Sequence, residues 1–305
     1  MDDVPCAACG QRRLGAHLTV AGEAGPEGLI PSTSRFGVAL SDIVRCRGCG
    51  HMQVAHFPSE AYLASAYAEA QSDAYLDEEA GQRATARATL GAVERHASGE
   101  ALLEVGCWVG FLLDEARRRG WRALGVEPST FASAIARERF GLDVLNADLF
   151  TAELDLGAYD AVILADVIEH LRDPAGALDR ITHLTRPGAI LYLALPDAGS
   201  RLARVMGVRW WSVIPTHLQY FTRQSLSTLL ARRGWEPLEL ETAPKAFTVG
   251  YYLARIGGYS ERVSRLLVTL ADRAGVAERI WAPDFRDRMA VLARRPDRAQ
   301  IRSVR

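Results

Sequence analysis

The sequence predicts an α/β protein built on a mostly parallel sheet of seven strands with helices on both faces. From about residue 100 onward, short apolar runs alternate with amphipathic segments, an order typical of parallel sheets with helical crossovers. The chain has 305 residues, of which 49% are hydrophobic and 24% charged. This length and composition suit a globular protein with a sizeable core. The net charge of −1 gives no overall field that would attract nucleic acid.

Strands are expected where short apolar runs are bounded by turn residues. These runs are 101–105, 122–126, 143–145, 161–165, 189–194, 236–241 and 289–294. Helices are expected where apolar residues recur at helical spacing, at 111–119, 130–140 and 174–184. A helix-patterned stretch from 248 to about 281 lies between the last two strands, and we expect it to be a lid or the surface of a homodimer.

Four of the five cysteines form two matching C-x-x-C-G units near the N-terminus: Cys6, Cys9, Cys46 and Cys49. Two such units commonly present four thiolates to a zinc ion, and a site of four thiolates leaves no open position for catalysis. We therefore expect a structural zinc ribbon, with an alternating strand at 36–40 between the knuckles. A redox dithiol is the alternative. His51 is expected to serve local structure.

The predicted division is a zinc ribbon at 1–57, a helical linker at 58–99, a main domain at 100–298 with an insertion at about 248–283, and a tail at 299–305. The N-terminus shows no signal-peptide pattern, and no apolar run approaches the ~18 residues of a membrane span. A cytoplasmic protein is expected. Lys245 is the only lysine, a bias toward arginine that we attribute to coding preference.

The most informative segment is 102–110, where an apolar strand enters a glycine-bearing turn that opens a helix. Such a turn lets a ligand approach backbone N–H groups at a helix N-terminus. Glu127 closes the next apolar run, 21 residues after Gly106. This is the spacing at which an acid meets ribose hydroxyls in nucleotide-binding α/β folds. The pair predicts an adenosine-type cofactor.

With these motifs the chain resembles the class I S-adenosylmethionine (SAM)-dependent methyltransferases, in particular bacterial small-molecule members with an N-terminal zinc ribbon. It is similar to zinc-containing sugar methyltransferases and to quinone-biosynthesis O-methyltransferases. The resemblance implies a Rossmann-like methyltransferase sheet. It also implies that Glu127 grips the ribose and that Asp148 faces the adenine amine. The cofactor-binding residues that it implies are Glu104, Gly106, Cys107, Trp108, Gly110, Glu127, Pro128, Asp148, Leu149 and Asp166.

Trp108 departs from the family pattern, because a second glycine usually stands there. In a dinucleotide site that glycine lets pyrophosphate touch the backbone. SAM has no phosphate and tolerates the loss better, so Trp108 argues against NAD. Its ring either borders the acceptor pocket or packs on a neighbouring helix. Aromatic side chains that could line the same pocket are Trp210, Trp211, Tyr220, Tyr251 and Tyr252.

Three residues are the candidates for catalysis. Methyl transfer needs an aligned acceptor and a base, for which histidine is suited. His217 lies in a segment that resembles the His-x-x-aromatic-Phe-Ser/Thr element of zinc-ribbon methyltransferases, and we expect it to be the base. Thr216 stands where the C-methylating members have Glu, which favours oxygen as the acceptor. Asp166, with His170, belongs to a D-x-x-E-H element similar to one that is thought to bind divalent metal. We do not favour such a second metal.

Other functions remain open at this point. C- or N-methylation of a nucleotide sugar or metabolite is one alternative. An rRNA methyltransferase whose zinc ribbon recognises RNA is another, but it would need a basic stripe for phosphate contacts, and we regard nucleic acid as an improbable partner. A non-catalytic SAM-binding scaffold is the third. The leading expectation is a SAM-dependent O-methyltransferase with a small-molecule acceptor, such as a sugar, glycan precursor or secondary metabolite.

Overall fold

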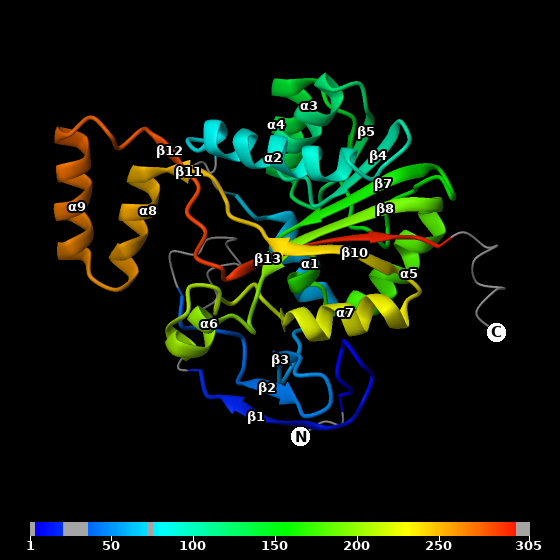
Figure 1. Ribbon diagram of the computed structural model, residues 1–305, viewed down its shortest axis with the longest axis horizontal. Coiled ribbons are helices and arrows are strands. Elements are labelled where there is room, and N and C mark those ends of the chain that lie inside the picture. Colours follow the sequence, from blue (N-terminus) through cyan, green and yellow to red (C-terminus); the bar gives the residue numbers. More distant parts are fainter. Residues whose placement is uncertain (1–3, 21–35, 72–75, 297–305) are drawn as a thin grey trace.

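The computed structural model describes residues 4–20, 36–71 and 76–296. Helices lie on both faces of a central sheet, a smaller sheet lies beneath it in the view of Figure 1, and a helical arm projects to one side. The predicted tail at 299–305 lies outside the described residues. Among the residues described, no helix has the length and apolar character needed to cross a membrane.

The central sheet has seven strands in the order β10-β13-β8-β7-β4-β5-β6. The strands are β4 (Ala101–Val105), β5 (Arg122–Val126), β6 (Val144–Leu145), β7 (Tyr159–Ala165), β8 (Thr185–Pro196), β10 (Glu236–Thr242) and β13 (Arg288–Arg294). From β8 to β6 neighbouring strands run parallel, while β13 is antiparallel to both β8 and β10. The predicted sheet is confirmed, and every predicted strand of it is present.

Helices cover both faces of this sheet. The helices are α2 (Glu79–Glu94), α3 (Phe111–Arg118), α4 (Thr130–Phe140), α5 (Pro174–Leu184) and α7 (Arg223–Arg232). Apolar side chains of α2, α3 and α4 pack with Leu102 and Ile163 on one face. Those of α5 and α7 pack with Leu103 and Val162 on the other. Successive residues of β4 thus face opposite layers, as the pleat requires.

The N-terminal unit is a four-stranded antiparallel sheet in the order β1-β2-β3-β9. Its strands are β1 (Leu14–Leu18), β2 (Ile43–Cys46), β3 (Met52–Val54) and β9 (Gln219–Tyr220). The strand expected at 36–40 is wrong. These residues form a loop in which the Gly37 N–H donates to Val213 O, and Ala39 packs with Trp210 and Val213. The segment is tied to the main domain instead of pairing in the ribbon sheet.

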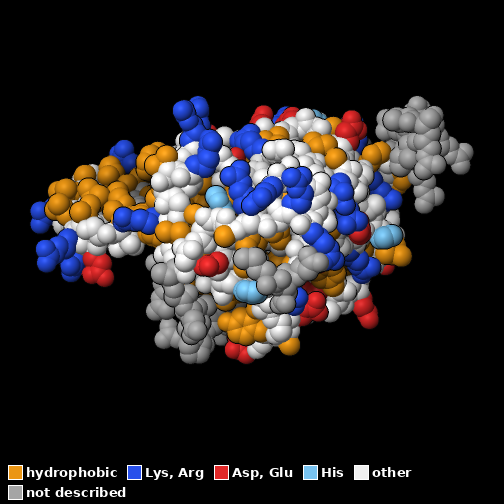
Figure 2. All heavy atoms as spheres, turned by 90° about the horizontal axis from the view of Figure 1, so that it is seen from below, with side chains coloured by type: hydrophobic (Ala, Val, Ile, Leu, Met, Phe, Trp, Pro, Cys, Tyr) orange, Lys and Arg blue, Asp and Glu red, His pale blue; other side chains and the backbone are white. Residues whose placement is uncertain are grey.

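The linker contains α1 (Glu60–Ala68), capped by Ser59, followed by α2. Between β10 and β13 lies the predicted insertion. It consists of β11 (Phe247–Thr248), α8 (Val249–Arg255), α9 (Glu261–Arg273) and β12 (Ile280–Trp281). The pairing of β11 with β12 closes its base. Figure 2 shows hydrophobic side chains gathered on this arm, where Val263, Leu266 and Leu270 are exposed. Shorter elements are α6 (Arg201–Met206), η2 (Ile168–His170), η3 (Gly207–Arg209) and η4 (Ile256–Gly258).

Candidate active site

A cavity of about 1810 Å³ lies at the edge where the parallel strands end. In open α/β sheets ligands bind at this edge, outside the carboxyl ends of the strands. The walls come from α1, the turn after β4, the ends of β5 and β7, the loop before β9, and the base of the helical arm. Segments far apart in the sequence therefore meet around one space.

The turn after β4 places Gly106 and Trp108 in the left-handed region of backbone conformation. Gly106 has φ +70°, and a Cβ at this position would lie 2.5 Å from Val167 Cγ2. Trp108 has φ 48°, uncommon for a residue with a side chain. Its N–H donates to Glu127 Oε2 at 2.8 Å, which helps to hold this conformation. Backbone strain of this kind is typical of ligand sites.

Glu127 lies at the end of β5 and is only 4% exposed. Its two carboxylate oxygens accept hydrogen bonds from the backbone N–H groups of Trp108 and Ser129, each at 2.8 Å. Burial raises the pKa of Glu127 to about 7. A carboxylate offers about four acceptor positions, so acceptor capacity remains for the hydroxyls of a ribose.

Seven of the ten residues expected to bind the cofactor line the cavity: Gly106, Trp108, Glu127, Pro128, Asp148, Leu149 and Asp166. Asp148 is held at the rim, since its Oδ1 accepts from Phe150 N at 2.7 Å and Thr151 N at 3.0 Å. The other three residues, Glu104, Cys107 and Gly110, are not part of the lining and lie behind the turn.

These three residues support the turn from the core. The Cys107 side chain packs in the cluster between α3 and the sheet, and Gly110 is the N-cap of α3 with φ 85°. Glu104 is 5% exposed, and its Oε2 has no hydrogen-bond partner within the described chain. Burial and the neighbouring Glu127 raise the pKa of Glu104 well above its usual value. A glycine turn beside the buried carboxyl of Glu127 fits the ribose of an adenosine cofactor such as SAM.

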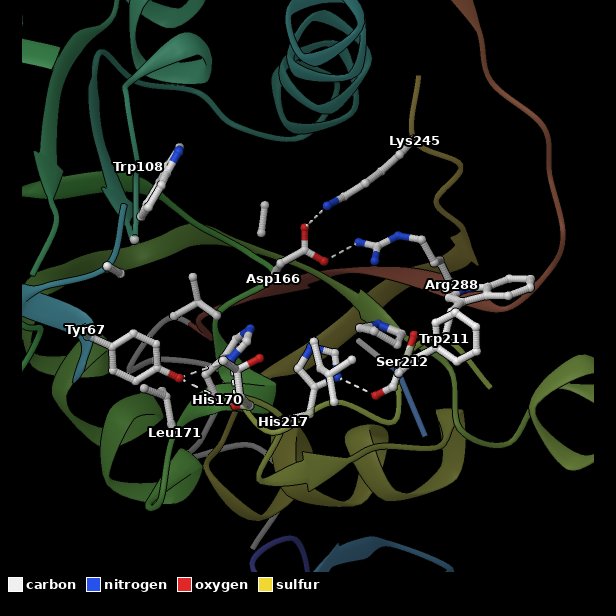
Figure 3. A pocket seen from close by; sticks show the side chains of 18 of the residues that line it. Tyr67, Trp108, Asp166, His170, Leu171, Trp211, Ser212, His217, Lys245 and Arg288 are labelled. Atoms are coloured by element: carbon white, nitrogen blue, oxygen red, sulfur yellow. Dashed lines mark hydrogen bonds and ion pairs between the residues drawn. The ribbon is translucent and has the colours of Figure 1, made fainter. Parts of the chain in front are cut away.

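Two histidines lie side by side on the opposite wall (Figure 3). His170 Nδ1 is 2.8 Å from Thr216 O, and His217 Nδ1 is 2.8 Å from Ser212 O. Because a carbonyl oxygen only accepts, these contacts place the proton on Nδ1 of each ring and leave a lone pair on Nε2. The ring centroids are 4.8 Å apart with the planes at 74°.

Both histidines are neutral at physiological pH. Burial lowers the pKa of His170 to about 4. Burial, together with His170, lowers the pKa of His217 well below its usual value. The hydroxyl of Tyr67, from α1, lies 3.2 Å from His170 Nδ1. Tyr67 lies in the segment that the sequence predicted only as a helical linker, and nothing near it in the chain marks it as part of a site.

The predicted D-x-x-E-H set is brought together only in part. Ligand atoms of Glu169 and His170 lie within 4.8 Å of one another and of His217, while Asp166 is not in this group. Both carboxylate oxygens of Glu169 are buried and have no hydrogen-bond partner among the described residues. Burial and Asp166 raise the pKa of Glu169 to about 8. These three residues are the ones that could hold a divalent metal in the cavity wall.

The Asp166 carboxylate is directed toward two cationic side chains, Lys245 and Arg288 (Figure 3). Its Oδ1 lies 2.5 Å from Arg288 Nη2, and its Oδ2 pairs with Lys245 Nζ. Burial opposes ionisation, but Arg288 and Lys245 outweigh it and keep the pKa of Asp166 well below its usual range. Asp166 is therefore unsuited to be a general base at neutral pH. Sequence reasoning missed both cations as site residues.

Three of the five expected aromatic residues line the cavity, namely Trp211, Tyr251 and Tyr252. Trp210 and Tyr220 do not. They are 2% and 4% exposed and pack in the core between the small sheet and the main domain.

The four cysteines of the N-terminal unit form a separate buried cluster. Their sulfur atoms lie within 4.8 Å of one another, with Cys6–Cys49 and Cys9–Cys46 separations of 3.6 Å. A tetrahedral zinc ion with Zn–S bonds of about 2.3 Å would place sulfurs about 3.8 Å apart. Gly10 and Gly50, which follow the two knuckles, both have φ 74°, the backbone form that these turns favour in glycine.

The fold and this site define a class of protein that comparison with known families confirms. The chain belongs to the methyltransferase domain family, whose model matches residues 76–240, more than half of its length. This match bears out the resemblance to class I SAM-dependent methyltransferases.

Individual relatives share less than a third of their aligned residues with this chain. A ubiquinone biosynthesis O-methyltransferase of Dinoroseobacter shibae is 27% identical in an alignment of 154 residues that covers 46% of this chain and 62% of that protein. The match thus spans less than two thirds of the curated relative.

Solved structures share the fold. A SAM-dependent methyltransferase of Archaeoglobus fulgidus is similar with a TM-score of 0.50 and 19% identity, covering 73% of this chain and 100% of that one. A chain of the complex between the Trm112 methyltransferase activator and a methyltransferase of Haloferax volcanii gives a TM-score of 0.52 and 15% identity, covering 74% and 96%.

Proposed function

We propose that this protein is an enzyme that transfers the methyl group of SAM to a hydroxyl oxygen of a small-molecule acceptor. One observation carries the proposal: a single cavity joins Gly106 and Glu127 to the paired histidines His170 and His217. A cofactor side and an acceptor side therefore share one space. The O-methyltransferase activity of the Dinoroseobacter shibae relative supports oxygen as the acceptor atom.

On the cofactor side, this chain's residues bind and orient. Glu127 would accept from the ribose hydroxyls, and Asp148 would accept from the adenine amine at the rim. Glu104 supports the turn from behind as a buried carboxyl group. When bound, SAM supplies an electrophilic methyl group on a sulfonium, so the protein's remaining task is to align the acceptor and remove its proton.

On the acceptor side, His217 is the proposed general base. Its Nδ1–H donates to Ser212 O, which orients the ring and leaves Nε2 to take the hydroxyl proton. Since the pKa of His217 is lowered, the ring is a weak base that is neutral over a wide pH range. Such a base suits a fairly acidic hydroxyl, as in a phenol or enol. His170, with a second available Nε2, is the alternative base.

A metal-assisted version is the second candidate, favoured by the carboxylate oxygens of Glu169, which have no hydrogen-bond partner among the described residues. A divalent ion held by Glu169, His170 and His217 would make His217 a ligand and would acidify the acceptor hydroxyl instead. The ribbon cysteines are proposed to hold a structural zinc, which would stabilise a unit too small for a large core of its own.

Calorimetry and a turnover assay test the function together. The full-length protein should bind SAM and its demethylated product, S-adenosylhomocysteine (SAH), and should release SAH when supplied with an accepted hydroxyl compound from a panel of phenols, enols and sugars. Absence of binding to both SAM and SAH would reject the proposal. Methylation of carbon or nitrogen in the product, shown by mass spectrometry and NMR, would reject the O-transfer.

A further inference from the structure

The helical arm carries most of the exposed apolar side chains of the described chain. Seven of the eleven large hydrophobic side chains that are exposed there lie between residues 259 and 285. They are Tyr259, Val263, Leu266, Leu270, Ile280, Trp281 and Phe285. Single exposed apolar side chains are ordinary on a protein surface, but a concentration of them marks an interaction site.

Three of these side chains form a stripe along α9. Val263, Leu266 and Leu270 are spaced by three and four residues, so they lie on one side of the helix. They are 46%, 59% and 50% exposed. The inner side of α9 is occupied by α8, because the buried Ser264 donates through its hydroxyl to Leu253 O at 3.0 Å. The stripe therefore lies on the outer side of the arm.

The arm holds this stripe away from the cavity. In Figure 1, α8 lies between α9 and the body of the molecule, and Tyr252 of α8 lines the cavity. The segment 248–259 is held at both ends. Thr248 N donates to Glu78 Oε2 at 2.8 Å, and the Tyr259 hydroxyl donates to Arg209 O at 2.9 Å. The side of the arm that faces the cavity is therefore α8, and the stripe on α9 is directed elsewhere.

Cationic side chains border the stripe. At 3.6 residues per turn, Arg262 and Arg273 lie roughly 50–75° around the helix from the middle of the stripe. Glu261 and Asp272 lie roughly 150–175° from it, on the opposite side of the helix. Both arginines are exposed, and Figure 2 shows cationic side chains at the edges of the apolar surface of the arm. The stripe thus has positive charge beside it and negative charge far from it.

This arrangement of charge selects the partner. In an antiparallel pair of two copies, the same edge of each helix would meet its counterpart, so the arginine edges would repel each other. An anionic lipid surface suits both features of the helix. Apolar side chains enter the boundary between headgroups and acyl chains, while arginines extend to the headgroup phosphates. A helix that projects from the body of the protein also fits a flat, extended surface.

We propose that α9 is an interfacial helix that docks this protein on a membrane whose headgroups are anionic. The apolar stripe then enters the headgroup boundary, and Arg262 and Arg273 contact lipid phosphates. The cavity lies near the bilayer in this arrangement, because Glu261 at the start of α9 and Trp281 beyond its end also line it. Docking of this kind does not depend on which atom the enzyme methylates.

Vesicle sedimentation tests the docking without any variant. The full-length protein is mixed with vesicles of phosphatidylcholine alone, or of phosphatidylcholine and phosphatidylglycerol in equal parts, at low and at high NaCl. At low NaCl we expect an affinity for the anionic vesicles about ten-fold or more above that for the neutral ones, and it should fall as NaCl is raised. Absence of binding to the anionic vesicles, or equal binding to both kinds, would overturn the proposal.

Variants then assign the binding to the stripe and its arginines. Leu266→Gln should lower the affinity for anionic vesicles about ten-fold, and Arg262→Gln combined with Arg273→Gln should also weaken its dependence on NaCl. Leu156→Gln and Arg122→Gln are the matched controls. Leu156 is 69% exposed and precedes β7, and Arg122 is exposed at the start of β5, so both lie at the edge of the sheet opposite the cavity. Binding that is lost in the controls as well, or that is unchanged in the α9 variants, would overturn the proposal.

Sedimentation equilibrium without vesicles tests a second copy as the partner. All the substituted side chains are exposed, so the variants should keep the melting temperature of the wild type. Leu266→Gln should also leave the molecular mass in solution unchanged. A wild-type dimer that Leu266→Gln converts to a monomer would show that a second copy covers the stripe, and would overturn membrane docking.

Discussion

His51, two residues after Cys49, and Gln219, on β9, form a buried hydrogen bond, with His51 Nε2 lying 2.9 Å from Gln219 Oε1. Gln219 Nε2 in turn donates to Leu171 O at 3.0 Å, the residue after His170. Gln219 also pairs with β3 through the backbone of β9, two residues after His217. The side chain of Gln219 therefore connects the cysteine-rich unit to the segment after His170, and its backbone lies in the strand that follows His217.

This connection predicts that Gln219→Ala impairs turnover. The change leaves Leu171 O and the His51 ring without their partner, which should cost about 2 kcal/mol in the free energy of unfolding. It also frees the segments that carry His170 and His217. Turnover should fall at least ten-fold, while the affinity for SAH, measured by calorimetry, stays within two-fold of wild type.

Gln53→Ala provides the matched control. Gln53 is the cross-strand neighbour of Gln219 and is equally buried at 1% exposure, but its Oε1 accepts from Ala7 N within the cysteine-rich unit. Its loss should lower thermal stability to a similar extent with little effect on turnover. If both variants lose activity in parallel, the effect reflects general destabilisation and the connection has no special role.

Metal content tests the ribbon. The purified protein should contain one zinc ion per chain by elemental analysis, and Cys46→Ser should lose it together with several degrees of melting temperature, because structural zinc contributes directly to folding. Cys107→Ala is the control, since Cys107 is the fifth cysteine and lies in the core of the main domain. Zinc retained in Cys46→Ser, or lost in Cys107→Ala, would contradict the four-thiolate assignment.

Local patterns explain which parts of the fold could be predicted. The bounds of β4, β5 and α4 follow from apolar periodicity and from turn or cap residues within a few positions, such as Ser129 before α4. The loop at 36–40 alternates like a strand, but its backbone bonds to a residue far along the chain, Val213. Periodicity carries no information on such a partner.

The candidate site likewise contains residues that the sequence could predict and residues that it could not. Gly106 and Glu127 were predictable because their spacing is set by one strand-helix-strand unit. Lys245 and Arg288 belong to no motif, and they meet only because β10 and β13 are neighbours that place residues 245 and 288 at the same edge of the sheet. Recognition of that pair requires the topology of the sheet's antiparallel edge, which the helical arm interrupts in the sequence.

Glu104 should make stability depend on pH. The pKa of this buried carboxyl is raised in the folded protein, so above its ordinary value of 4.5 the unfolded chain releases a proton that the folded chain retains. Stability from Glu104 is complete at low pH and is lost as pH rises, by about 1.4 kcal/mol per pH unit within the window between the two pKa values. Glu104→Gln mimics the protonated form and lacks this loss. Without cofactor, the melting temperature of Glu104→Gln should exceed that of wild type by a margin that grows as the pH rises above 5. A margin that does not change with pH would contradict the assignment.

Matched alanine variants distinguish the roles of the two histidines. If His217 is the base, His217→Ala should lower turnover by about 10²- to 10⁴-fold and leave SAH affinity unchanged, because the ring lies away from the turn that holds the cofactor. His170→Ala should lower turnover less, since His170 contacts Tyr67 and Thr216 O and positions the neighbouring loop. The reverse order of effects would transfer the base role to His170. A metal held by Glu169, His170 and His217 predicts a different result, because a ligand set fails when any member is removed. Turnover would then fall equally in His217→Ala, His170→Ala and Glu169→Gln, and added Mg²⁺ or Mn²⁺ would stimulate the wild type.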